Sequence, residues 1–110
     1  MDATEQYNDL IKKIKGELPL RALPVRELVQ IFREKGHPIT LKTELTLKDV
    51  HNSGDVSGIM CIVQNDKENV IACALTHLIF SPKFPMFKEI SDYQRKREKR
   101  IKKLNKFGLN

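Results

Sequence analysis

The spacing of apolar side chains changes twice along this chain, and no other feature constrains the fold more. Over residues 4–15 apolar side chains recur at the three- and four-residue intervals of a helix. These are Tyr7, Leu10, Ile11 and Ile14. From Ile39 the interval becomes two, which is the period of a strand with one buried face. Beyond residue 86 the helical interval returns. The pattern predicts helices towards both ends and strands between them.

Six elements follow from these intervals and from the turn-forming residues between them. A second helix is predicted from Pro24 to Lys35, because Pro suits a first helical position and Pro38 lies just beyond Gly36. Strands are predicted over residues 39–48, 56–64 and 70–80, and a long last helix over residues 86–106. The predicted fold class is α+β, with the order α-α-β-β-β-α. Its helices pack on a three-stranded antiparallel meander.

Length and hydropathy predict a single soluble domain. With 110 residues the chain has room for one domain, a body over about residues 4–85 and the last helix over residues 86–106. The longest apolar runs, residues 59–63 and 70–75, are far shorter than the roughly 20 residues of a membrane-spanning helix. The first eight residues lack the apolar core of a signal peptide. We expect a cytoplasmic protein without a membrane span.

Positive charge is concentrated at one end of the chain. The formal net charge is +6, from 20 Lys and Arg and 14 Asp and Glu. Residues 95–106 hold eight basic residues and one acid, a net of +7, and the other 98 residues have a net of −1. The sequence therefore describes a near-neutral body that carries one strongly basic helix.

The basic residues of the last helix lie opposite an apolar stripe. At about 100° per residue, Met86, Ile90, Tyr93, Ile101 and Leu104 share one face, and Arg97 falls inside it. A helix of this length spans about 31 Å, so its second half is expected to project past the sheet. The residues predicted to bind phosphate or another polyanion are Arg95, Lys96, Lys99, Arg100, Lys102, Lys103 and Lys106.

A row of Lys and Arg along a helix can neutralise the phosphates of nucleic acid and release their counterions. We therefore predict a small non-catalytic nucleic-acid-binding accessory protein, with RNA or DNA as its partner. The alternative is a protein-interaction or regulatory module, a homodimer whose basic helix contacts an acidic protein. A solvated charged face that only keeps the protein soluble would leave the same pattern in the sequence.

Two other uses of a basic amphipathic helix compete with nucleic-acid binding. The helix could lie on an anionic membrane, against which the absence of Trp and the interruption by Arg97 argue. It could also pair with a second copy through positions spaced as in a coiled coil, where polar Gln94 and Arg97 weaken the seam. A second copy could instead add to the third predicted strand, whose segment from Val70 to Leu75 has no charge.

No catalytic, metal or cofactor site is predicted. His37, His51 and His77 are too scattered for a metal site. Asp49, His51 and Asp55 surround a predicted turn, where turn residues that hydrogen-bond their own backbone explain the pattern better than acid–base chemistry does. Cys61 and Cys73 are predicted to be reduced core residues. They become cross-strand neighbours if the hairpin between them turns at Lys67.

From Pro24 onward the predicted order of helix, three strands and helix resembles that of double-stranded RNA-binding domains. The segments Pro24-Val25-Arg26-Glu27-Leu28 and Lys35-Gly36-His37-Pro38 resemble the first helix of that family and its exit. The family's Lys-Lys-x-Ala-Lys start of the last helix is absent near Phe87, and the last helix has no alanine. The resemblance covers about 80 residues and implies an order of elements, not membership of the family.

Overall fold

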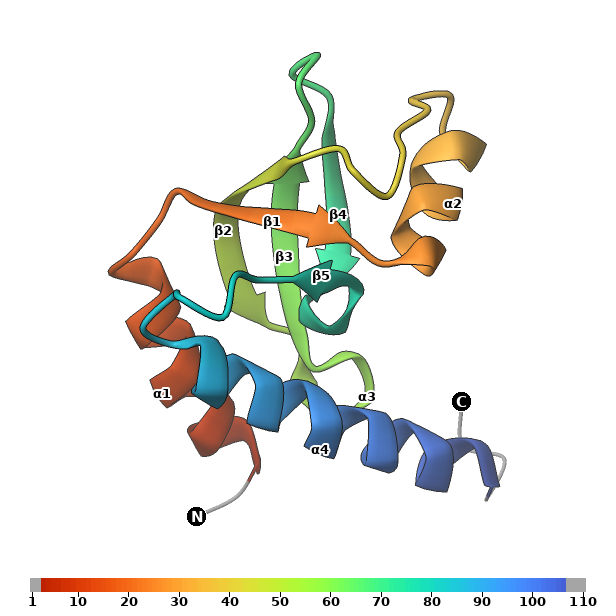
Figure 1. The fold of residues 1–110 in the computed structure, drawn as a ribbon. Coiled ribbons are helices and arrows are strands. Elements are labelled where there is room, and N and C mark those ends of the chain that lie inside the picture. The colour runs from red at the N-terminus through yellow and green to blue at the C-terminus, as the bar shows by residue number, and fades with distance from the viewer. Residues whose placement is uncertain (1–2, 107–110) are drawn as a thin grey trace.

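The computed structural model describes residues 3–106, with the side chains of residues 7–103, 105 and 106. The described chain forms helices at both ends and a sheet between them (Figure 1). In chain order the elements are α1 (Ala3–Lys15), β1 (Leu20–Pro24), α2 (Arg26–Glu34), β2 (Leu45–Asn52), α3 (Gly54–Ser57), β3 (Ile59–Gln64), β4 (Val70–Ala74), the 3₁₀ turn η1 (Leu75–His77), β5 (Leu78–Ile79) and α4 (Phe87–Lys106).

The five strands form one antiparallel sheet in the order β4-β3-β2-β1-β5. Strand β1 pairs with β2 on one side and with β5 on the other, where Leu23 lies opposite Ile79. The register between β2 and β3 shifts between Leu47 and Asp49, and an irregularity of this kind bends a strand. The sheet is curled, and in Figure 1 β1 and β5 cross in front of β3.

The core lies inside the curl of the sheet. Along β3 buried side chains alternate with half-buried ones, and Leu45 of β2 and Val63 of β3 are fully buried. Helix α1 packs against β2 and buries Ile14 completely. Each such side chain contributes about 1.5–3 kcal/mol by leaving water. Helix α4 lies beside α1, and an ion pair of 2.9 Å between Lys13 and Glu89 joins the two.

The predicted fold class is confirmed at the coarse level: this is a small compact α+β domain with an antiparallel sheet. The three long helices begin and end within two residues of the predicted positions. The strand predicted over residues 56–64 is correct for residues 59–64, which form β3 between β4 and β2, whereas residues 56 and 57 belong to α3, a helix that was not predicted. Helical periodicity and the Gly and Pro signals were sufficient at these places.

The predicted strand over residues 39–48 is correct only for its last four residues. Strand β2 begins only at Leu45, and residues 39–44 are irregular. Within this segment the backbone is satisfied locally: Thr43 N donates to the carbonyl of Thr40, and Thr40 N donates to the hydroxyl of Thr43, at 3.1 and 3.0 Å. Thr hydroxyls offer the backbone such an alternative to a strand ladder. Of the two apolar residues in this segment, Ile39 is buried and Leu41 is half exposed.

The predicted strand count and order, α-α-β-β-β-α, are wrong at two further places. No element is predicted between the first two helices, but β1 begins just after Pro19. Residues 70–80 were expected to be one strand, but η1 divides them, and the chain passes from the β3 side of the sheet to β1. The Val25 amide donates to the carbonyl of His77 at 3.0 Å and ties this crossing to α2. These additional strands also depart from the order on which the resemblance to double-stranded RNA-binding domains depends.

Candidate nucleic-acid interface on the last helix

The first half of α4 is fixed to the body by one apolar side chain and two polar ones. Ile90 is 1% exposed and lies in the core. The hydroxyl of Tyr93 accepts a hydrogen bond of 2.8 Å from the Ile59 amide at the start of β3. The side-chain amide of Gln94 donates to the carbonyls of Leu75, the first residue of η1, and Leu78, just after η1, at 2.9 and 2.8 Å. These contacts fix the rotation of α4 about its axis, and with it the direction in which the opposite face points.

Gly58 lets α4 approach the sheet closely. Its backbone has φ of +70°, a conformation that L side chains rarely adopt. A Cβ at this position would lie 2.5 Å from the Tyr93 hydroxyl and 2.8 Å from Nε of Arg97. Glycine is therefore required at this position both by the backbone conformation and by the closeness of α4.

Arg97 is the buried cation of α4. It is 4% exposed, and its guanidinium donates to the carbonyls of Asp55 and Val56 in α3. The last carbonyls of any helix lack hydrogen-bond donors within the helix. In the one-turn helix α3 the guanidinium of Arg97 supplies these donors. The stripe position predicted for Arg97 from the sequence is confirmed, whereas its attachment to α3 was not predicted. We call Tyr93, Arg97 and Arg100, with α3 and Gly58, the α3 clamp.

Arg100 completes the α3 clamp at its exposed edge. Its guanidinium donates to the carboxylate of Asp55 at 2.6 Å, and this hydrogen bond lowers the pKa of Asp55 below its usual value. Nearly half of each side chain faces solvent, so the pair contributes little to stability. Because its charge has a carboxylate partner, Arg100 is less available to phosphate than the sequence analysis expected.

The remaining predicted phosphate-binding residues differ in how their charge is compensated. Arg95 is exposed and pairs with Asp92 on its own helix. The five lysines are all exposed, and no ion pair with any of them occurs in the part of the chain that the structure describes. We call these five residues the lysine ridge: Lys96, Lys99, Lys102, Lys103 and Lys106.

The second half of α4 extends away from the body. Every side chain described between Glu98 and Lys106 is exposed, including Ile101 at 37%. Figure 1 shows this half running past α3 with no element on its outer side. The lysine ridge therefore lies on a convex surface that is open to a large partner.

The other chemistry-bearing residues do not form a site in the described chain. Asp49 accepts a hydrogen bond of 2.9 Å from the amide of Val50, and Asp55 is occupied by Arg100. No group of three or more His, Cys, Asp or Glu side chains suited to a metal ion occurs among residues that the structure describes.

The two cysteines are buried, free thiols. Cys61 and Cys73 lie directly opposite each other on β3 and β4, which confirms the predicted pairing about Lys67. Burial raises the pKa of the Cys73 thiol to about 12, and that of Cys61 also rises. Both remain protonated at neutral pH and are therefore poor nucleophiles.

Comparisons with protein-family models, curated proteins and solved structures find no match for this chain. Among the described residues no helix combines the length and the hydropathy needed to cross a membrane. Sequence reasoning found the basic face of α4, but it missed Gly58 and the role of Tyr93. The one signal for them was a lone Gly just before an apolar strand.

Proposed function

We propose that this protein binds nucleic acid through the phosphate backbone, with the lysine ridge as its contact surface. The observation that carries the proposal is the way α4 divides its cations. Arg97 is buried in the α3 clamp and Arg100 is paired with Asp55, whereas the five lysines are exposed without an ion pair in the described chain. Unpaired cations along about 15 Å of helix attract a polyanion, and release of its counterions supplies the binding free energy.

Binding of this kind depends on charge and not on base sequence. Lysine presents a point charge to phosphate, while base reading relies on bidentate Arg, Asn or Gln side chains in a groove. Single strands are commonly held by exposed aromatic rings, and every aromatic side chain that the structure describes is buried or half-buried. We therefore favour a duplex as the ligand and expect RNA and DNA duplexes to bind similarly.

Charge reversal tests the proposal. Wild-type protein should bind a short fluorescein-labelled DNA duplex with a Kd of about 10⁻⁴–10⁻⁶ M in a titration of fluorescence anisotropy. The variant K99E/K103E/K106E should bind at least about tenfold more weakly, because three phosphate contacts become repulsive.

A matched control separates the lysine ridge from net charge. The variant K35E/K42E/K48E has the same net charge, and its three sites are exposed and lie outside α4. It should bind within about threefold of wild type, since its changes leave the contact surface intact. Equal losses in the two variants would contradict the proposal, as would the absence of wild-type binding to any duplex at low salt.

A second candidate, a homodimeric interaction module, is favoured by the position of β4. This strand is at one end of the sheet, contains no charged residue and leaves Val70 57% exposed. A second copy could extend the sheet by pairing along this edge. Gel filtration at micromolar concentration should then give a dimer that V70K converts to a monomer. A monomeric wild type would contradict this candidate.

A further inference from the structure

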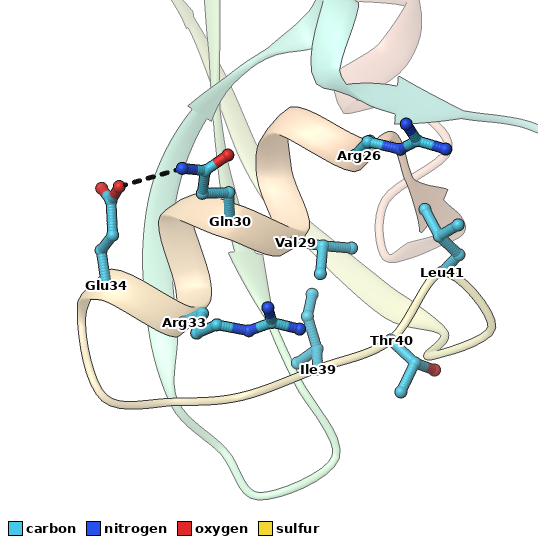
Figure 2. Close-up of a pocket in the computed structure, with 8 residues that line it drawn as sticks. All are labelled: Arg26, Val29, Gln30, Arg33, Glu34, Ile39, Thr40 and Leu41. Atoms are coloured by element: carbon cyan, nitrogen blue, oxygen red, sulfur yellow. Dashed lines mark hydrogen bonds between the residues drawn. The ribbon is translucent and has the colours of Figure 1, made fainter.

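A groove lies beside α2, on an element that the proposed function does not use (Figure 2). It has a volume of about 540 Å³ and lies between α2 and residues 39–41. This is within the range of roughly 300–1,000 Å³ found for ligand sites. Residues 39–41, which belong to the irregular segment where the sequence pattern predicted a strand, form the wall opposite α2.

The floor of the groove is apolar. Val29 of α2 and Ile39 of the facing segment are 9% and 5% exposed, and they point toward each other in Figure 2. Leu41 lies at one end and is 50% exposed. Covering these three side chains would remove apolar surface from water, and Leu41 would gain most.

Two arginines extend over this floor from α2. Arg26 points toward Leu41 and Arg33 toward Ile39 (Figure 2). Seven residues of helix separate their α-carbons by about 10.5 Å. Within the described chain neither has an ion pair or a side-chain hydrogen bond, although each is next to a glutamate in sequence. Glu34 instead accepts a hydrogen bond of 3.4 Å from Gln30.

We infer that the groove binds a short, extended acidic segment of a partner protein, with an apolar side chain between two carboxylates. Each guanidinium can hold one carboxylate through two parallel hydrogen bonds. Three residues of a peptide in the extended polyproline II conformation make one turn and cover about 9 Å, so two carboxylates three residues apart share a face and match the spacing of Arg26 and Arg33. The apolar side chain between the carboxylates covers the floor at Val29, Ile39 and Leu41.

The chain itself does not present such a segment in its described part. Carboxylates two to four residues apart occur at three places along residues 3–106. At one of them the intervening residue is Lys67, whose charge would repel the arginines. At the other two, Ile90 is buried and Tyr7 packs against the ring of Tyr93. A second copy could therefore fill the groove only by giving up part of its own packing. A nucleic acid is also a poor match, because the floor is apolar.

The test uses a defined probe, the fluorescein-labelled peptide Gly-Gly-Asp-Leu-Val-Asp-Gly-Gly, titrated with the full chain. Fluorescence anisotropy should show saturable binding below about 1 mM. The variant R26Q/R33Q should weaken binding at least about tenfold, and the control K35Q/K42Q, with the same net charge, should not. A probe with Asn in place of both Asp residues should bind at least about tenfold more weakly than the acidic one.

Each other outcome overturns the inference. Unchanged binding to R26Q/R33Q, equal binding of the Asn probe, or no binding at about 1 mM would each do so. If wild type were a dimer and R26Q/R33Q a monomer, the occupant of the groove would be a second copy of the chain. If an unlabelled duplex displaced the peptide, the groove would bind nucleic acid. Duplex binding by R26Q/R33Q should equal that of wild type, so failure here is distinguishable from failure of the proposed function.

Discussion

Arg95 and Arg97 show how much the surroundings of a residue determine its role. Both are on α4, two positions apart, and the sequence places them on different faces. Arg95 is exposed and pairs with Asp92 one turn earlier. Arg97 is 4% exposed and donates to two carbonyls of α3. Of these two arginines, only Arg97 connects α4 to the body.

Truncation of these two arginines should have unequal effects on stability. R97M leaves the carbonyls of Asp55 and Val56 without their donor and should lower the free energy of unfolding by about 1–3 kcal/mol. R95M removes one exposed ion pair and should change it by less than about 0.5 kcal/mol. Urea denaturation of both variants and wild type measures the difference. Equal losses would show that Arg97 does not anchor α4.

His77 gives the stability a dependence on pH. Burial lowers the pKa of His77 below its usual value of 6.5, and Nδ1 is buried without a hydrogen-bond partner in the described chain. The folded state therefore binds fewer protons than the unfolded state just below pH 6.5. The stability that His77 contributes is present above that pH and is lost as pH falls through the lower, folded-state pKa.

The variant H77Q should accordingly lose less stability than wild type between about pH 7.5 and about pH 5. Chemical denaturation at the two pH values measures the loss, and H51Q, at an exposed histidine, serves as the control. H51Q should lose as much stability as wild type between the two pH values. If H77Q lost as much stability as wild type between the two pH values, the pH dependence would belong to other groups.

At the scale of elements, the three long helices could be predicted from sequence, the short helix α3 was missed, and the strands could be predicted only in part. Periodicity and the Gly and Pro signals placed α1, α2 and α4 within two residues. Strand β1 was missed because Pro19 precedes it, and η1 was missed because the apolar run from Val70 to Phe80 continues through it. A change of strand partner leaves no mark on hydropathy. The pairing of β1 with β5 depends on tertiary contacts that no local pattern encodes.

Helix α4 should behave as two halves. The α3 clamp and Gln94 hold the turns of residues 93–97 against the body. In residues 102–106 every side chain that the structure describes is exposed. A helical segment this short is marginal without packing. Amide hydrogen exchange followed by NMR should therefore show strong protection in the first set and weak protection in the second. Equal protection along α4 would contradict this division.

At the scale of the whole molecule, the sequence predicted the basic face of α4 but not which of its cations remain available. Asp55 is 45 residues from Arg100 in the chain, so only the fold brings them together. Asp92 was visible one turn from Arg95, but whether such a pair forms depends on side-chain conformation. Of the seven predicted residues, five keep their charge unpaired within the described chain, and they form the lysine ridge.

The salt dependence of duplex binding tests the central claim most directly. Five phosphate contacts predict that log K falls with log salt concentration with a slope of about −4.5 for duplex DNA. K103Q should make this slope shallower by about 0.9, and K42Q, at an exposed lysine outside α4, should leave it unchanged. We expect these three slopes. A wild-type slope near zero, or a K103Q slope equal to that of wild type, would contradict it.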